Sequence, residues 1–175
     1  MKCVEAINTS VNQLSRLNST LALLTRIENK QFTEKEEIDL AGLLERHLNL
    51  LEEPIGLRKI RVEKQFHRKG LVVLMDQGLA DLLIANLLKN AIVHNKEGGS
   101  ILLETGPGRL SIQNDGTPLA FKQEDLFTRF VRDTKRSGNF GLGLSLVKKV
   151  CETYNFLIEY SFENERHTFT VIFNA

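Results

Sequence analysis

Two asparagines one helical turn apart, Asn86 and Asn90, stand in a stretch that is otherwise almost wholly apolar, from Asp81 to His94. A helix of this composition must be buried over most of its circumference. A buried amide without a hydrogen-bond partner costs about 1 to 3 kcal/mol, so we expect a polar group to meet the pair. The alternative is that both side chains bond only to neighbouring backbone.

A glycine-rich segment, Gly138-Asn-Phe-Gly141-Leu-Gly143, leads into a second predicted helix. Glycines at a helix N-terminus leave the outward-pointing backbone N–H groups unobstructed, which suits a phosphate, although a plain turn is the alternative. The segment lacks the Gly-Lys-Ser/Thr ending of a P-loop, and it does not open a first parallel unit as a dinucleotide fingerprint does. Together with the asparagines, it predicts a nucleotide pocket of another type.

Two further roles in such a pocket can be assigned to amide or carboxylate oxygens. Mg²⁺ takes oxygen ligands and keeps several waters while it bridges nucleotide phosphates, and the Asn90 amide suits that role. Adenine needs a hydrogen-bond partner for its exocyclic amine in an apolar slot, and Asn114 or Asp115, just before Gly116, could supply it. A simple Asn-Asp-Gly turn is the alternative.

The periodicity of apolar residues predicts the elements that position these groups. Helices are expected at about 4–27, 40–51, 77–93 and 142–154. Strands are expected at about 60–66, 71–75, 100–104, 109–113, 156–162 and 168–173. Pro54 and Gly56 are expected to end the second helix. Strands and helices interleave without the regular alternation of a doubly wound sheet, which predicts an α+β fold with a mixed sheet and helices on one face.

The composition limits the class of protein. A chain of 175 residues is long enough for one well-packed domain and an appendage. Its 23 basic and 22 acidic residues nearly cancel, so no field of one sign favours nucleic acid as a partner. Cys3 and Cys151 are too few and too far apart for a disulfide framework or a metal site, which favours the cytoplasm. No apolar run reaches the roughly 18 residues of a membrane span.

The first predicted helix carries apolar residues at spacings of three and four from Val4 to Ile27, which form one stripe. Such a stripe needs a partner. A second copy of the chain and the rest of the same chain are equally compatible with the pattern.

Four segments in order carry a family resemblance: Asn86-Leu-Leu-Lys-Asn90-Ala, Asn114-Asp-Gly116, Phe127-Thr-Arg-Phe130 and the glycine segment up to Leu144. They resemble the N, first-glycine, F and second-glycine boxes of sensor histidine kinases, in the GHKL superfamily. The resemblance implies a Bergerat α/β sandwich: a mixed, mostly antiparallel sheet of about five strands with about three helices on one face, after a long N-terminal helix.

The resemblance also implies a division of the chain. Residues 1–30 are similar to the second helix of the dimerisation and histidine-phosphotransfer hairpin, residues 31–37 would be a linker, and residues 38–175 would be the ATP-binding catalytic domain.

Site residues follow from the resemblance by position. Asn90 would hold Mg²⁺ and Asn86 would lie beside the phosphates of ATP, while Gly116 would let the chain pass close to adenine. Gly141 and Gly143 would cradle phosphates. Phe127 and Phe130 would anchor a lid, and Arg129 or Arg132 would reach the terminal phosphate. The other positions implied around the nucleotide are Val93, His94, Lys135, Gly138, Phe140, Leu142 and Leu144.

Three positions depart from the family pattern. The family usually has Asp-Asn-Gly at the adenine site, whereas this chain has Asn114-Asp115-Gly116, so the amide oxygen of Asn114 would accept the adenine amine. Pro118 stands where a second glycine is usual. Val93 and His94 replace a lysine and a tyrosine, and His94 would either cap the helix or substitute for the missing cation.

The function implied is transfer of the γ-phosphoryl group of Mg·ATP to a histidine, for relay to a response regulator. None of His47, His67, His94 and His167 has the sequence context of the phosphoacceptor, so that histidine is expected outside this chain. Water-using ATPases of the same superfamily place a glutamate base where Asn86 stands, and an amide cannot take a proton.

Two alternatives remain: a degenerate scaffold that dimerises without catalysis, or another GHKL ATPase. In the kinase interpretation, the full-length protein would form a homodimer through the N-terminal helix. The chain would then be the cytoplasmic part of a protein anchored in the bacterial inner membrane.

Overall fold

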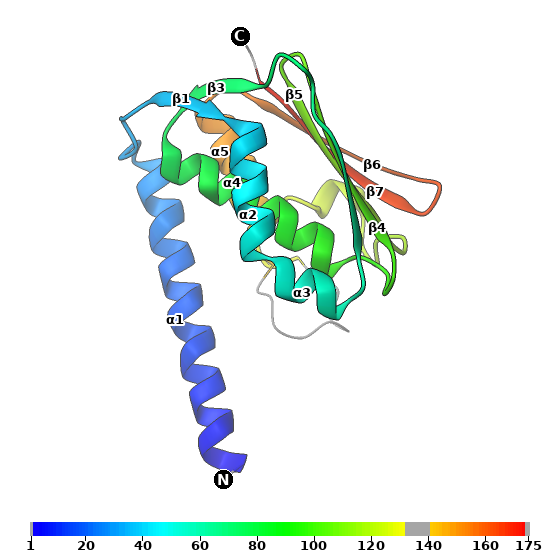
Figure 1. Cartoon of the computed structure of the whole chain (residues 1–175). Coiled ribbons are helices and arrows are strands. Elements are labelled where there is room, and N and C mark those ends of the chain that lie inside the picture. The colour runs from blue at the N-terminus through cyan, green and yellow to red at the C-terminus, as the bar shows by residue number, and fades with distance from the viewer. Residues whose placement is uncertain (1, 132–140, 174–175) are drawn as a thin grey trace.

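A five-stranded sheet runs through the molecule, and helices cover one of its faces (Figure 1). The structure, a computed structural model, describes residues 2–131 and 141–173, with side chains in the first helix only at 11, 14, 15 and from 17 onward. The sheet has the order β2-β4-β5-β7-β6. Its strands are β2 (Arg61–Gln65), β4 (Ser100–Gly106), β5 (Arg109–Asp115), β6 (Leu157–Glu163) and β7 (Arg166–Ile172).

Only the pairing of β2 with β4 is parallel, and the other three pairings are antiparallel. The mixed, mostly antiparallel sheet and the α+β class predicted from the sequence are therefore confirmed. β4 and β5 form a hairpin around Pro107 and Gly108, and Gly108 takes the positive φ of 65° that a tight turn requires.

Alternation along the central strands determines which side chains face the helices. In β7, His167, Phe169 and Val171 are buried, whereas the residues between them are partly exposed. β5 follows the same pattern, with Leu110, Ile112 and Asn114 buried. Because successive side chains point to opposite faces, Asn114 and His167 lie on the helix-covered face together with the apolar core.

Three helices form the second layer: α2 (Leu40–Leu50), α4 (Gln77–Val93) and α5 (Gly143–Thr153). α4 packs against both α2 and α5, and its buried face carries eight apolar residues. α2 and α4 begin at aspartates, Asp39 and Asp76, whose carboxylates accept hydrogen bonds from first-turn N–H groups. The bounds of α4 agree with the expected 77–93.

One local prediction was wrong. The helix at 40–51 does not end because of Pro54. It ends at Leu50, and Pro54 lies in the first turn of a further short helix, α3 (Glu52–Leu57), where proline lacks only an N–H that would be unpaired anyway. The structure also contains a strand that was not predicted, β1 (Glu36–Asp39).

The strand expected at 71–75 is present and pairs with β1. That strand, β3 (Val72–Met75), does not join the main sheet but pairs antiparallel with β1 in a separate two-stranded sheet. Its inward residues Val73 and Met75 are buried in the common core, which closes the end of the helical layer.

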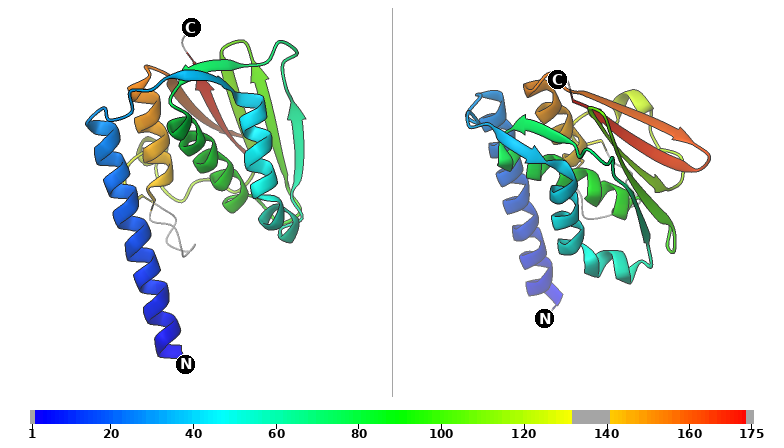
Figure 2. Two further views of the ribbon diagram at one scale, coloured as in Figure 1. Left: turned by 60° about the vertical axis from the view of Figure 1, so that its left-hand side comes forward. Right: turned by 45° about the horizontal axis from the view of Figure 1, so that its top comes forward.

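The long first helix, α1 (Lys2–Glu28), touches the domain only near its C-terminal end and projects away from it (Figures 1 and 2). Leu24 and Ile27 are almost fully buried, and α1 contacts α5. Farther along the same stripe, Val11 is 57% exposed and Leu14 is 64% exposed. Packing against the same chain therefore covers one end of the apolar stripe and leaves the middle open. No helix in the described part of the chain is long and apolar enough to cross a membrane.

Candidate nucleotide-binding site

Helix α4 and the N-terminus of α5 meet at Asn86 and Gly143. A Cβ atom added to Gly143 would lie only 2.9 Å from the Oδ1 atom of Asn86, so the two elements approach as closely as a glycine allows. The Asn86 Nδ2 group donates to the Leu82 carbonyl at 2.8 Å, which holds the amide in place. The asparagine helix and the glycine segment, 57 positions apart in sequence, are therefore adjacent in space.

The start of α5 differs from the starts of α2 and α4. Leu142 stands at its N-cap and offers no side-chain hydrogen bond to the first-turn N–H groups. Before it, Gly141 has a φ of 68°, and its carbonyl accepts a hydrogen bond from the Phe130 N–H at 3.0 Å. Uncapped N–H groups and the positive end of a helix dipole form an arrangement that binds anions such as phosphate.

The other predicted site residues of α4 lie beyond Asn86, toward the end of the helix, and are partly exposed. Asn90 is one turn beyond Asn86, and Val93 and His94 follow at the end of the helix, all three partly exposed. Among the described residues, no hydrogen bond of the Asn90 side chain is found. His94 is the C-cap residue of α4, as one of the two expectations for it proposed. Its carbonyl lies against Gly116, 3.2 Å from the place of an added Cβ.

Asn114 presents a buried acceptor for which the described part of the chain offers no donor. Asn114 is 1% exposed, and its Nδ2 group donates to the main-chain oxygen of Asp115 at 3.0 Å. The Oδ1 atom finds no partner within the described residues. The Oδ1 atom of Asn95 is also unpaired, but it packs against Gly99, where an added Cβ would come within 2.3 Å. An unpaired buried carbonyl is costly, so Asn114 fits a ligand that donates a hydrogen bond.

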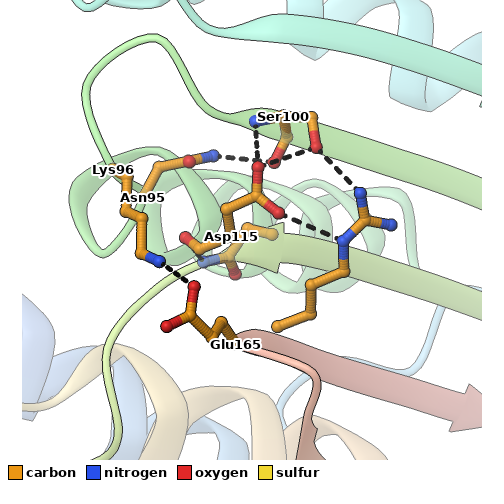
Figure 3. Close-up of polar contacts among 7 residues, drawn as sticks. Asn95, Lys96, Ser100, Asp115 and Glu165 are labelled. Atoms are coloured by element: carbon orange, nitrogen blue, oxygen red, sulfur yellow. Dashed lines mark hydrogen bonds and ion pairs between the residues drawn. The ribbon is translucent and has the colours of Figure 1, made fainter.

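Asp115 is held by protein groups instead (Figure 3). Its Oδ2 atom accepts from the Ser100 N–H at 2.7 Å and from the Ser100 hydroxyl at 2.9 Å, and its Oδ1 atom accepts from Arg166 at 3.1 Å. Burial raises the pKa of Asp115, but the Ser100 hydrogen bonds and the Arg166 charge outweigh burial and lower the pKa below 3.8. Of the two candidate acceptors for an adenine amine, only Asn114 keeps a free oxygen.

The Asp115 network leads to a prediction about acid stability. We expect Asp115→Asn to lower the free energy of unfolding at pH 7 by about 1 kcal/mol, because Ser100 and Arg166 lose a charged acceptor. A carboxylate with a lowered folded-state pKa stabilises the fold above its unfolded pKa, near 3.9, and this contribution disappears as the pH falls through the folded pKa. Denaturant unfolding from pH 7 to pH 3 should therefore show the variant and the parent converging below about pH 4.

The matched control is Glu163→Gln, at an exposed carboxylate on the edge strand β6, which β7 separates from β5. Parallel stability curves for Asp115→Asn and the parent over the whole range would contradict the assigned role of this carboxylate.

The segment between β5 and α5 supplies the expected aromatic residues. Phe127 packs edge-on against Phe169 of β7, with ring centroids 6.4 Å apart, so it is anchored to the core. Phe130 is 56% exposed and has a positive φ of 68°. Arg129 donates to Glu28 at the end of α1 with an N–O distance of 2.6 Å. Arg132, Lys135, Gly138 and Phe140 lie outside the described residues.

Sequence reasoning missed several residues that surround the first-glycine box. Asn114 pairs across the sheet with His167, whose Nδ1 atom lies 2.8 Å from the Tyr160 hydroxyl. Gly116 packs directly against the His167 ring: an added Cβ would come within 2.3 Å of its Cδ2 atom. The alternating pattern of β7 places His167 on the inner face, but nothing in the sequence fixes its register against β5.

The described residues limit how a metal ion could bind. They contain no group of three or more His, Cys, Asp and Glu side chains placed to hold a metal ion. A metal ion beside Asn90 would therefore take most of its ligands from nucleotide phosphates and water, which is how Mg²⁺ is usually held.

Comparison with known proteins places these features in a family context. The sequence profile described as "Histidine kinase-, DNA gyrase B-, and HSP90-like ATPase" matches residues 75–175. Over 96% of its length, the chain is 30% identical to the heme sensor protein HssS of Staphylococcus aureus (strain JH9), of which it covers 38%. The chain thus spans about two-fifths of the length of the curated relatives it matches.

Solved structures show the same fold. The histidine kinase AdeS of Acinetobacter baumannii superposes with a TM-score of 0.78 at 24% identity, covering 98% of this chain and 83% of that one. The nucleotide-free catalytic domain of the histidine kinase ThkA gives a TM-score of 0.69 at 26% identity, covering 79% of this chain and 94% of that one. These matches confirm the resemblance that the four sequence segments gave.

Proposed function

Because the chain belongs to the family of histidine kinase-, DNA gyrase B- and HSP90-like ATPases, we propose that it is the ATP-binding, catalytic part of a two-component sensor histidine kinase. The reaction proposed is in-line transfer of the γ-phosphoryl group of Mg·ATP to an imidazole nitrogen of a histidine outside this chain. The approach of Asn86 to Gly143 is the main support for this proposal, because it brings the asparagine helix to an uncapped helix N-terminus.

Each part of the nucleotide has a proposed contact. Asn114 accepts the hydrogen bond of the adenine amine, since its buried Oδ1 atom lacks a partner among the described residues. The first-turn N–H groups of α5, with Gly141 and Gly143, bind phosphate oxygens. Asn90 is one ligand of Mg²⁺, which neutralises phosphate charge when bound. Arg129, once released from Glu28, contacts the terminal phosphate.

The choice of a histidine over water as the phosphoryl acceptor rests on Asn86. A water-using ATPase needs a base near the terminal phosphate, and an amide cannot take a proton. Asn86 moreover uses its N–H group on the Leu82 carbonyl. Catalysis by this chain would then consist of positioning and charge neutralisation, and the base would come from the protein that carries the acceptor histidine.

Further partners are proposed from the relatives. The histidine kinase ThkA has been solved in complex with the response regulator protein TrrA, and we propose a response regulator as the final acceptor here. The open stretch of α1 around Val11 and Leu14 supports a homodimer through this helix. The full-length protein is proposed to be anchored in a membrane, with this chain on the cytoplasmic side.

Phosphoryl transfer is the experiment that tests the proposal. The chain would be mixed with a separately produced helical hairpin that carries a phosphoacceptor histidine, in the presence of Mg²⁺ and γ-labelled ATP. We expect acid-labile, base-stable label on the hairpin, and none with the Asn90→Ala variant or with the acceptor histidine replaced by glutamine.

Two other outcomes would identify a competing function, and a third would contradict the proposal without naming another. Release of inorganic phosphate without label on the hairpin would favour a water-using ATPase. No heat of binding with millimolar Mg·ATP would favour a scaffold that has lost its nucleotide site. Binding without transfer to any hairpin histidine would contradict the proposed kinase activity.

A further inference from the structure

The peptide unit between Asp115 and Gly116 is fixed from both of its polar ends. Its carbonyl oxygen, on Asp115, accepts from Asn114 Nδ2 at 3.0 Å. Its N–H, on Gly116, donates to the Glu165 carbonyl at 2.9 Å. A backbone carbonyl can only accept, so it selects which end of the Asn114 amide faces it. The orientation of that amide, which the proposed adenine contact requires, therefore depends on the position of this one peptide.

His167 supports the same peptide from the neighbouring strand. Its Cδ2 and Nε2 atoms would lie 2.3 and 2.4 Å from a Cβ at Gly116, so the imidazole occupies the space that a side chain would need. The residue is 5% exposed and is the cross-strand partner of Asn114. Any shift of the ring toward or away from Gly116 would consequently move the peptide that orients Asn114.

The His167 ring is itself held on two further sides. The Tyr160 hydroxyl lies 2.8 Å from its Nδ1 atom, and the two rings stack with centroids 5.9 Å apart. The Phe162 ring approaches with a centroid distance of 4.7 Å. Burial raises the pKa of Tyr160 to about 12, so the hydroxyl keeps its proton at neutral pH. The ring is thus positioned by side chains from the edge strand β6.

We propose that His167, held by Tyr160, is a positioning residue that gives the nucleotide site its selectivity for a 6-aminopurine over a 6-oxopurine. This inference rests on the proposed function. A fixed Asn114 Oδ1 atom accepts from the amino group of adenine and repels the carbonyl oxygen at the same ring position of hypoxanthine. An amide that is free to rotate can present its Nδ2 group instead and donate to that carbonyl. Loosening His167 therefore removes the discrimination between the two bases.

The test compares the affinities of Mg·ATP and Mg·ITP by calorimetry on the whole chain. The parent is expected to prefer ATP by about tenfold or more, because one correctly paired hydrogen bond replaces an acceptor-acceptor contact. In His167→Ala and Tyr160→Phe, we expect the ATP-to-ITP affinity ratio to fall several-fold toward one. Tyr160→Phe keeps the stacked ring and removes only the hydroxyl, so it serves even if His167→Ala fails to fold.

Thr170→Ala is the matched control. It removes a hydroxyl from β7, the strand of His167, on the face of the sheet away from Asn114. This hydroxyl lies 3.3 Å from that of Ser111. The substitution should leave the ATP-to-ITP affinity ratio unchanged. A purely structural role for His167 would weaken both nucleotides in equal proportion, and that result would overturn the inference. So would a parent protein that binds ATP and ITP equally well. Absence of binding by the parent would instead overturn the proposed function.

Discussion

Replacing Asn90 with alanine is expected to abolish Mg²⁺-dependent ATP binding without unfolding the domain. The Asn90 side chain is partly exposed and has no hydrogen bond to any described residue, so its loss removes no internal contact of the fold. Alanine is also the better helix former, which favours α4. Calorimetry with Mg·ATP should show no binding at millimolar nucleotide, while the denaturant midpoint stays at or slightly above that of the parent.

Two controls define the role of the metal. Lys89→Ala changes the adjacent, exposed position of the same helix and should leave the affinity within about twofold, apart from weak screened charge effects. The parent measured with a chelator in place of Mg²⁺ should behave like Asn90→Ala. An unchanged affinity in Asn90→Ala would remove this residue from its proposed role as a metal ligand.

The substitution Gly141→Ala is expected to eliminate nucleotide binding and to destabilise the start of α5. Its Cβ would lie 2.5 Å from the Val131 carbonyl oxygen and 2.9 Å from the Phe130 carbonyl carbon, both of which are backbone atoms that cannot move aside cheaply. The positive φ of 68° adds about 1 to 2 kcal/mol for any residue with a Cβ. In Gly141→Ala, the backbone must therefore shift just before the N-terminus of α5, which is proposed to bind phosphate.

Gly98→Ala is the matched control for this substitution. Gly98 has the same φ of 68°, but no described residue other than its chain neighbours has an atom within 4 Å of its added Cβ. Gly98→Ala should lower the free energy of unfolding in urea only by the cost of the positive φ, about 1 to 2 kcal/mol. It should bind Mg·ATP normally. If Gly141→Ala is no worse than Gly98→Ala in stability and affinity, the close backbone approach at Gly141 has no functional importance.

Local patterns were sufficient to predict the elements that carry the candidate site. The helix at 77–93 was predicted from a long, almost continuous run of apolar residues, and the structure adds the capping Asp76 just before it. The β4–β5 hairpin follows from Pro107 and Gly108 between two alternating strands. The closeness of α4 and α5 was implied by the family resemblance and is seen in the contact of Asn86 with Gly143.

Features that depend on pairing between distant segments could not be predicted. β1 contains Glu36 and Glu37 among its four residues, and it is a strand because β3, some 35 positions later, pairs with it. The contact of Gly116 with His167 depends in the same way on the register between β5 and β7. Strand formation of this kind reflects tertiary context more than intrinsic propensity. The nucleotide contacts of the site residues remain predictions.

The ion pair between Glu28 and Arg129 joins the last residue of α1 to the segment that precedes α5. Both side chains are more than 40% exposed, and ion pairs in such surroundings contribute only about 0.2 to 1 kcal/mol. A doubly charged phosphoryl oxygen cluster can therefore take over the guanidinium at little energetic penalty. In the proposed site, where Arg129 contacts the terminal phosphate, the same guanidinium would be shared between the C-terminal end of α1 and the nucleotide.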